Sequence, residues 1–247
     1  MNRELYLCSL LMLAVFAGMI WYLADYVSSN QEALFNNSYN SQQRVLAQEN
    51  TRGTIYAGTG EVLAQTVIAE DGTSVREYPY KNTFAHVVGY TDKGKTGIEE
   101  LENYQLIHSD ISDREKLDHE LAGEKNPGND VYTTLDTSLQ QAASDALGLY
   151  RGAIVVTEVK TGRVLAMVSK PDYDPNKIAE NWETLSTDKD KAALVNRGTQ
   201  GLYPPGSTFK IVTALAYIRQ NPDSWQNYHY QCNGAYINGD NKINCYH

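Results

Sequence analysis

Cysteine, histidine and positive charge are all scarce in this chain, and each scarcity excludes a class of function. The 247 residues include three cysteines and five histidines. No group of them has the spacing of metal ligands, so we expect neither a metal site nor another cofactor. Lysine and arginine total 21 against 30 aspartate and glutamate residues, which gives a net charge of −9. Because nucleic-acid-binding proteins normally present a basic face, we expect no nucleic-acid partner.

Charge is absent altogether from Leu5 to Ala24, the one long apolar segment. A helix needs about 20 apolar residues to cross a bilayer, and Trp21 and Tyr22 lie where aromatic belts form. A cleaved signal peptide is the alternative, but its apolar region is usually only about 7–15 residues long and ends in small residues. The segment therefore predicts an uncleaved single-pass anchor, with a cytoplasmic tip, within residues 1–27. The rest of the chain is expected on the outer side.

Residues 28–129 predict a polar stalk followed by a small mixed domain. Arg52 to Thr66 contains two short apolar stretches around a Gly-Thr-Gly turn, the pattern of a β-hairpin. Gly97 to Leu106 is acidic and helix-like, and residues 124–130 form a turn-rich boundary.

Residues 130–247 predict a second domain that also mixes strands and helices. Val131–Leu135 alternates like a strand, and Asp136 or Thr137 follows it as a helix cap. Apolar residues at 139, 142, 143, 146 and 147 then form a helical stripe. Gly152–Val159 and Arg163–Lys170 indicate two strands whose nearly continuous apolar character is typical of strands covered on both faces. The predicted fold class is therefore α+β.

Ser207-Thr208-Phe209-Lys210 is the motif that indicates chemistry, an S-x-x-K at the start of a predicted helix. A serine hydroxyl is a weak nucleophile until a base removes its proton. A lysine three residues later lies on the same helical face and can be that base, provided that burial and nearby positive charge lower its pKa. The helix N-terminus favours the negative charge that develops during attack. Taken alone, the motif is weak.

Its context resembles the monofunctional (class B) penicillin-binding proteins from the anchor to the last residue. Arg52 to Ala64 is similar to the pedestal motif R-G-x-I-x-D-R-x-G-x-x-L-A of this family, although Tyr56, Ala57 and Gly58 depart from its acidic-basic centre. The further matches follow in order along the chain: Gly97-Ile98-Glu99, Thr134-Leu135-Asp136 with Gln140, the strands from Gly152 and Leu165, Asp174-Pro175-Asn176, Asn196-Arg197, and Tyr203 to Lys210.

The resemblance implies a penicilloyl-serine transferase (β-lactamase-like) fold after the pedestal, which is a dimerisation-type domain. It implies peptidoglycan D,D-transpeptidase activity on D-Ala-D-Ala peptide stems, with Ser207 as the acylated nucleophile and Lys210 as its proton-transfer partner. It also implies β-lactams as inhibitors, the bacterial cytoplasmic membrane as location, and cell-wall synthesis or division proteins as partners.

Two elements of the family's active site are missing from the sequence after Lys210. No S-x-N occurs there, and the one K-T-G, Lys95-Thr96-Gly97, precedes Ser207 and falls in the pedestal. We therefore expect a transpeptidase domain that is incomplete at its C-terminal side and a chain that is inactive by itself. The alternatives are a catalytically inactive membrane-anchored scaffold for cell-wall synthesis partners, and a β-lactam sensor or class D-like β-lactamase. Neither a β-lactam sensor nor a class D-like β-lactamase needs a pedestal.

The three cysteines divide into two kinds. Cys8 lies in the apolar segment and is expected to be inert. Cys232 and Cys245 lie in a Gly/Asn-rich tail and are candidates for a disulfide if that tail is outside the cell.

Overall fold

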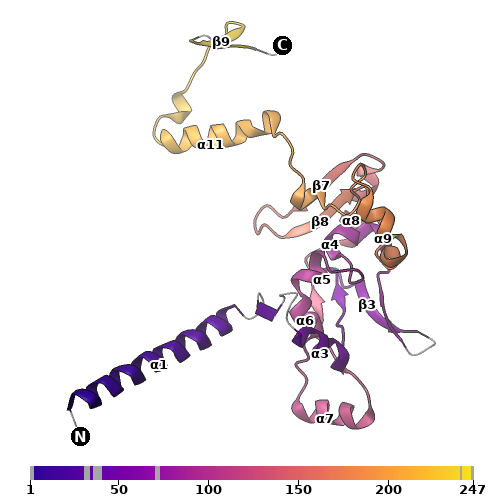
Figure 1. Ribbon diagram of the computed structural model, residues 1–247. Coiled ribbons are helices and arrows are strands. Elements are labelled where there is room, and N and C mark those ends of the chain that lie inside the picture. Colours follow the sequence, from indigo (N-terminus) through magenta and orange to yellow (C-terminus); the bar gives the residue numbers. More distant parts are fainter. Residues whose placement is uncertain (1–2, 31–33, 36–40, 70–72, 240, 246–247) are drawn as a thin grey trace. The chain divides into compact units, whose positions relative to one another are not determined.

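The computed structural model describes residues 3–30, 34–35, 41–69, 73–239 and 241–245. The chain forms two compact units, Met1–Gly201 and Leu202–His247. Helices and strands alternate in a mixed α/β arrangement (Figure 1). The helices of the first unit are α1 (Arg3–Ser29), α3 (Gln42–Glu49), η1 (Lys81–Phe84), α4 (Ala85–Val88), α5 (Gly97–Leu101), α6 (Asn103–Ile107), α7 (Asp113–Ala122), α8 (Thr137–Leu147), η2 (Pro175–Lys177), α9 (Ile178–Thr187) and α10 (Arg197–Gln200).

The strands of the first unit form three small sheets. They are β1 (Asn50–Thr51), β2 (Ile55–Tyr56), β3 (Val62–Ile68), β4 (Ser74–Glu77), β5 (Asn126–Pro127), β6 (Val131–Tyr132), β7 (Gly152–Thr157) and β8 (Val164–Lys170). One sheet has the order β4-β3-β2-β6, and β1–β5 and β7–β8 are two-stranded sheets. The second unit contains η3 (Gly206–Phe209), α11 (Lys210–Gln220), η4 (Trp225–Asn227), β9 (Ala235–Asn238) and β10 (Asn241–Asn244).

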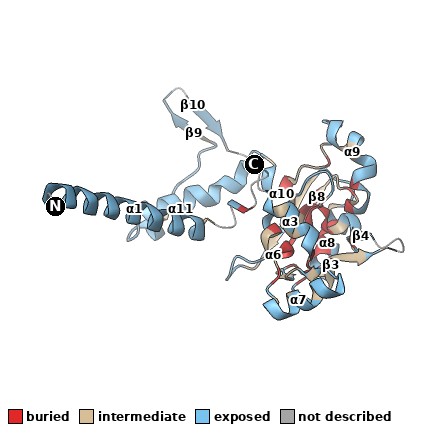
Figure 2. Ribbon diagram, turned by 60° about the horizontal axis from the view of Figure 1, so that its bottom comes forward, coloured by how far each residue is buried: buried red, intermediate tan, exposed pale blue. Residues whose placement is uncertain are grey.

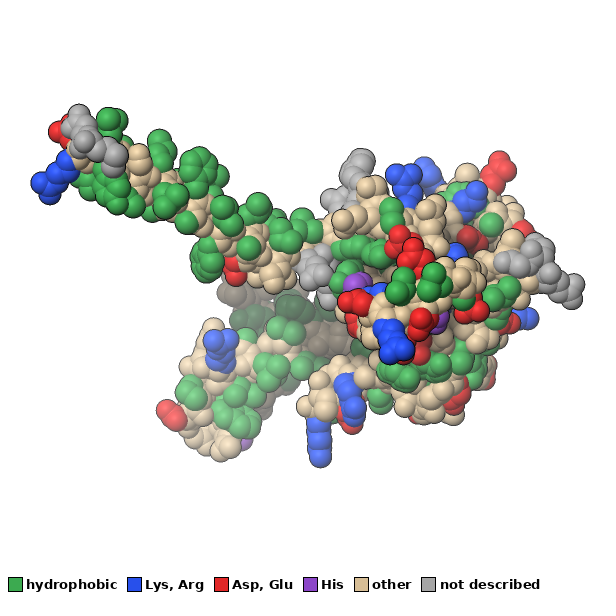
Figure 3. Space-filling model, turned by 90° about the horizontal axis from the view of Figure 1, so that it is seen from below, with side chains coloured by type: hydrophobic (Ala, Val, Ile, Leu, Met, Phe, Trp, Pro, Cys, Tyr) green, Lys and Arg blue, Asp and Glu red, His purple; other side chains and the backbone are tan. Residues whose placement is uncertain are grey.

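The charge-free N-terminal segment forms the long helix α1, which buries no residue. Its mean hydropathy reaches 2.2 over an 18-residue window, so it is long and apolar enough to cross a membrane. Apolar side chains cover much of its visible surface (Figure 3). The helix is longer than Leu5–Ala24 because backbone hydrogen bonding continues into polar residues at both ends.

The predicted hairpin is present as the antiparallel pair β2–β3, with Ile55 opposite Ala64. Strand β6 then adds to β2 in parallel, with Ile55 beside Val131. The strand predicted at Val131–Leu135 is therefore confirmed only for its first two residues. Tyr56, which departs from the family motif, stacks on Tyr132 with ring centroids 5.0 Å apart.

Apolar residues of the family motifs contribute to the main core, together with Tyr78, Phe84 and Val88. Figure 2 shows the buried residues gathered around β3, β8 and α8. The core cluster consists of Ile55, Ala57, Leu63, Ala64, Tyr78, Phe84, Val88, Leu106 and Leu135. Gly53 is needed beside this core because a Cβ at that position would lie only 2.0 Å from the carbonyl oxygen of Asn129. Backbone and side-chain packing therefore both depend on the Arg-Gly-x-Ile motif.

Helix α8 packs against the β7–β8 sheet and begins as predicted. The Asp136 carboxylate accepts a hydrogen bond from the Leu139 backbone N–H at 2.8 Å, which caps the helix. The predicted apolar stripe is only partly right: Ala143 is buried as expected, but Leu139 is exposed, and the polar residues Gln140 and Ser144 are buried instead. Gln140 can be buried because its amide is satisfied. It donates to the carbonyls of Thr83 and Met167 and accepts from the Met167 N–H.

Strands β7 and β8 form the predicted adjacent pair, which is antiparallel. Coverage on both faces is not found among the described residues, since Val155 of β7 is 44% exposed. Helices α8 and α10 pack on this pair, and from Ile154 to Thr157 the side chains of β7 are alternately half-buried and exposed.

His86 on α4 is buried and predicts a dependence of stability on pH. Its Nε2 lies 3.1 Å from the Pro171 carbonyl, so the neutral ring donates this hydrogen bond, and the ring packs edge-on against Tyr173. Burial is the main cause that lowers its pKa below the usual value. The unfolded chain therefore takes up a proton first as pH falls. The stabilising contribution is complete above about pH 6.5 and is lost as pH falls towards the folded-state pKa.

We therefore expect the melting temperature to fall between pH 7 and pH 5, and to fall less in His86→Gln, whose amide can donate but does not titrate. His229→Gln, at an exposed position, is the control and should behave like the parent chain. Equal pH dependence in His86→Gln and the parent would show that His86 is not the group responsible.

Candidate active site

Ser207 lies in the first turn of the helix formed by η3 and α11, as the sequence predicts. Pro205 precedes this turn, and Gly206 adopts φ +54°, a left-handed conformation that glycine adopts at little cost. The Thr208 N–H donates to the Pro205 carbonyl at 3.2 Å and closes the turn. The sequence Pro-Pro-Gly thus ends the preceding segment and starts the helix at Ser207.

Lys210 follows one turn later, and its backbone N–H donates to the Ser207 carbonyl. Residues three apart on a helix are neighbours on one face, so the two side chains leave the helix on the same side. Both side chains are exposed, and within the part of the chain that the structure describes no hydrogen bond joins them. The nucleophile and the base therefore lie on one face of the helix, but the Ser207 hydroxyl and the Lys210 amine are not hydrogen-bonded to each other.

The burial expected around Lys210 is not found among the described residues. Helix α11 buries no residue, and Ile211 and Leu215 of its predicted apolar stripe are more than 60% exposed. The reason is that little packs on this helix within its own unit, where Tyr217 meets the ring of Tyr228 at 5.0 Å.

Cys232 and Cys245 flank the β9–β10 hairpin and are brought together by it. The Cys245 N–H donates to the Gly234 carbonyl at 3.0 Å, next to the last strand pair. Both thiols are free and hydrogen-bond to each other, which lowers the pKa of Cys232 and raises that of Cys245. The disulfide stays a prediction, now with a structural reason, because the hairpin holds its two partners side by side.

Purification without reductant is expected to yield a chain with the Cys232–Cys245 bond and a free Cys8. A bridge closing a loop of about 15 residues contributes about 3 kcal/mol in the chain-entropy model. Peptide mass spectrometry after alkylation measures this directly. Cys232→Ser should leave Cys245 open to alkylation, and complete alkylation of both thiols in the parent chain would count against the bond.

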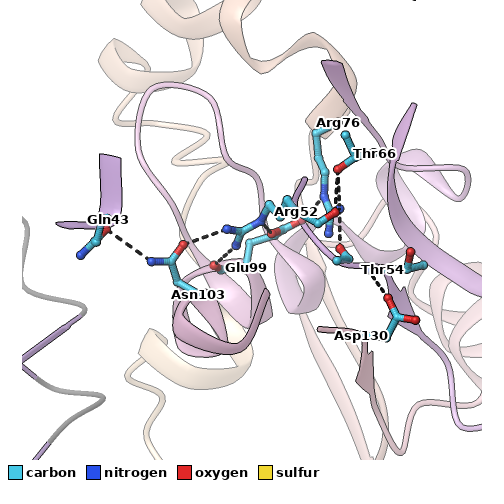
Figure 4. A network of polar contacts seen from close by, with 9 residues as sticks. Gln43, Arg52, Thr54, Thr66, Arg76, Glu99, Asn103 and Asp130 are labelled. Carbon is cyan, nitrogen blue, oxygen red and sulfur yellow. Dashed lines mark hydrogen bonds and ion pairs between the residues drawn. The ribbon is translucent and has the colours of Figure 1, made fainter. Parts of the chain in front are cut away.

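A second polar centre lies in the pedestal, where two family motifs meet (Figure 4). The Glu99 carboxylate is fully buried and binds two guanidinium groups, Arg52 Nε at 2.6 Å and Arg76 Nε at 2.8 Å. Arg52 also donates to Asn103 Oδ1 at 2.8 Å. The Arg-Gly-x-Ile and Gly-Ile-Glu segments are thus joined by an ion pair. The sequence did not indicate Arg76 as a member of this cluster, because no pattern of residues in β4 shows which distant carboxylate Arg76 binds.

In Lys95-Thr96-Gly97, which spells K-T-G, the first two residues lie in the loop before α5 and Gly97 begins that helix, so the triplet is not on a strand. Gly97 has φ +62°, and a Cβ there would lie 2.6 Å from the Val87 carbonyl oxygen. Glycine at position 97 is therefore required by the local backbone conformation and packing. This agrees with the interpretation that this K-T-G is not a catalytic element.

Two family profiles match the chain in the order of these regions. The penicillin binding protein A dimerisation domain matches residues 52–131, and the penicillin binding protein transpeptidase domain matches residues 152–247. Peptidoglycan D,D-transpeptidase PbpA of Mycolicibacterium smegmatis is 39% identical over 198 residues, which cover 72% of this chain and 40% of that protein. This chain therefore spans less than half the length of that relative.

Solved structures agree with the profiles. A D,D-transpeptidase domain of a peptidoglycan glycosyltransferase from Eggerthella lenta has a TM-score of 0.65 at 37% identity, covering 79% of this chain and 43% of that one. The penicillin G acyl-enzyme complex of penicillin-binding protein A from Mycobacterium tuberculosis has a TM-score of 0.65 at 31% identity, covering 80% and 49%. These likenesses define a transpeptidase-type protein with a dimerisation-type domain before its S-x-x-K helix. The chain belongs to the class B penicillin-binding proteins.

Proposed function

We propose that this protein is a peptidoglycan D,D-transpeptidase with Ser207 as nucleophile. The observation that carries the proposal is the position of Ser207 at the start of the η3–α11 helix, one turn before Lys210. This helix lies in the region matched by the transpeptidase profile. A helix N-terminus next to a nucleophile stabilises the oxyanion that forms on attack.

The reaction follows from these two residues. Lys210 takes the proton of the Ser207 hydroxyl, and Oγ attacks the carbonyl carbon of the penultimate D-alanine of a peptide stem. The peptide bond to the terminal D-alanine breaks, D-alanine leaves with a proton, and an acyl-serine ester remains. An amine of a second stem then attacks the ester, releases Ser207 and forms the cross-link. β-Lactams, which acylate the same hydroxyl, act as inhibitors in this scheme.

Helix α1 is the proposed single-pass anchor in the bacterial cytoplasmic membrane, with the remaining residues on the outer side. The proposed domains are the tip and anchor at 1–27, the stalk and pedestal at 28–129, and the transpeptidase domain from 130 onward. The pedestal is proposed to contact proteins of cell-wall synthesis or division.

Product analysis separates this proposal from a β-lactamase, a sensor and a scaffold. The test protein is this chain extended by a transpeptidase C-terminal segment that carries S-x-N and K-[ST]-G. We expect it to release D-alanine from a D-Ala-D-Ala stem peptide, to join the stem to an added amine, and to remain acylated by penicillin. Rapid turnover of penicillin would indicate a β-lactamase. Stable acylation without action on the stem would indicate a sensor, and neither reaction would indicate a scaffold.

A further inference from the structure

A cavity of about 240 Å³ lies in the pedestal, beside the Arg52–Glu99–Arg76 cluster. Four cationic side chains line it, those of Arg52, Arg76, Lys95 and Lys125, and no described aspartate or glutamate does. The rest of the described lining is largely polar. In a chain whose net charge is −9, this is a local concentration of positive charge, and it favours an anion.

Among the residues that the structure describes, one carboxylate is ion-paired with the two buried guanidinium groups. This carboxylate, that of Glu99, serves both Arg52 and Arg76, so two positive charges face one negative charge. The side chains of Arg52 and Arg76 are only 13% and 8% exposed. An uncompensated positive charge at a buried, desolvated site has a high desolvation free energy unless a counter-ion binds to it.

Arg76 also keeps one donor unused. Its Nε binds Glu99, and its Nη1 donates to the Gly53 carbonyl at 2.7 Å and to Thr66 Oγ1 at 3.1 Å. Its Nη2 is buried and has no hydrogen-bond partner among the described residues. Buried donors are nearly always satisfied, so an unsatisfied guanidinium nitrogen on a residue that lines a cavity points to an acceptor supplied from outside the chain.

Lys95 and Lys125 complete the rim. Neither forms an ion pair with a described residue, and both are exposed, so their ammonium groups can move to meet a ligand. Desolvation is the main cause that lowers the pKa of Lys95, and the charge of Arg52 lowers it further, whereas the charges of Glu99 and Glu100 raise it. The four cationic side chains of the lining disfavour a divalent cation in this cavity.

We propose that this cavity binds a phosphate or carboxylate group of a small ligand, with Arg76, Lys95 and Lys125 as its cationic partners. Its volume is below the roughly 300–1,000 Å³ of sites for drug-sized ligands, so it holds one charged group and its immediate neighbours. The proposal concerns a different region from Ser207 and does not depend on the transpeptidase assignment.

Calorimetric titration of the 247-residue chain in an uncharged detergent tests the proposal. Sodium phosphate and sodium acetate are the two probes, each at pH 7 and at ionic strength kept constant with sodium chloride. We expect saturable binding of one anion per chain. Stronger binding of phosphate assigns the site to a phosphate-bearing ligand, and stronger binding of acetate assigns it to a carboxylate-bearing one.

The variants Lys95→Gln and Lys125→Gln remove rim charges without touching the buried ion pair, and each is expected to weaken binding about tenfold. Lys160→Gln, in the exposed turn between β7 and β8, makes the same change of net charge and should leave the affinity unchanged. Absence of saturable binding by either probe would overturn the proposal. So would affinity that is equal in Lys95→Gln, Lys125→Gln and the parent chain.

Discussion

Replacement of Glu99 by alanine is expected to destabilise the pedestal by about 3–5 kcal/mol, because it leaves two buried guanidinium groups facing each other without a counter-charge. The carboxylate is fully buried and binds Arg52 and Arg76 at 2.6 and 2.8 Å. A loss of this size lowers the melting temperature of a domain of roughly 200 residues by on the order of 10 °C. Thermal unfolding of the detergent-solubilised chain, followed by circular dichroism, measures it.

Glu100→Ala is the matched control, since this neighbouring glutamate is exposed and should change stability by less than about 0.5 kcal/mol. Glu99→Gln separates charge from shape, because it keeps the volume of the side chain and removes its negative charge. Glu99→Gln should therefore show most of the loss of stability that is expected for Glu99→Ala. A Glu99→Ala protein as stable as Glu100→Ala would refute the view that this ion pair holds the two pedestal motifs together.

Covalent labelling by a fluorescent penicillin is expected to differ at least about 100-fold in rate between the 247-residue chain and its extended form. The family resemblance implies that the strand carrying K-[ST]-G supplies a second oxyanion donor, and loss of one such donor typically costs about 10²–10³ in rate. That strand also positions the carboxylate of the substrate, which adds to the difference. Initial rates of label incorporation on denaturing gels measure both forms.

Ser207→Ala in the extended form should abolish the label, whereas Ser224→Ala should not, although Ser224 is also an exposed serine of the second unit. Lys210→Ala is expected to slow labelling strongly, because the hydroxyl then lacks its base. Labelling of the short chain as fast as that of the extended form would show that Ser207 and Lys210 suffice.

Local features of the fold were predictable because neighbouring residues determine them. The β2–β3 hairpin follows from a Gly-Thr-Gly turn between two apolar stretches, and α8 follows from the Asp136 cap. The start of the S-x-x-K helix follows from Pro205 and Gly206. In each case the signal and the structure lie within one turn of the chain.

Contacts between distant segments were not predictable in the same way. Gln140 is buried because Thr83 and Met167, which lie far from it in sequence, satisfy its amide, so a pattern of apolar residues could not include it in the buried face of α8. Arg76 belongs to the Glu99 cluster only because β4 pairs with β3. The environment of Lys210 depends on long-range packing too, so sequence could name the residue but not the burial around it.

The proposed function depends most on Ser207 as the acylated residue, and peptide mapping tests this assignment directly. The extended protein is incubated with penicillin, digested with a protease and mapped by tandem mass spectrometry. We expect a penicilloyl adduct on the peptide that contains Tyr203 to Lys210, with the added mass on Ser207. An adduct on any other residue, or full acylation that persists in Ser207→Ala, would contradict it.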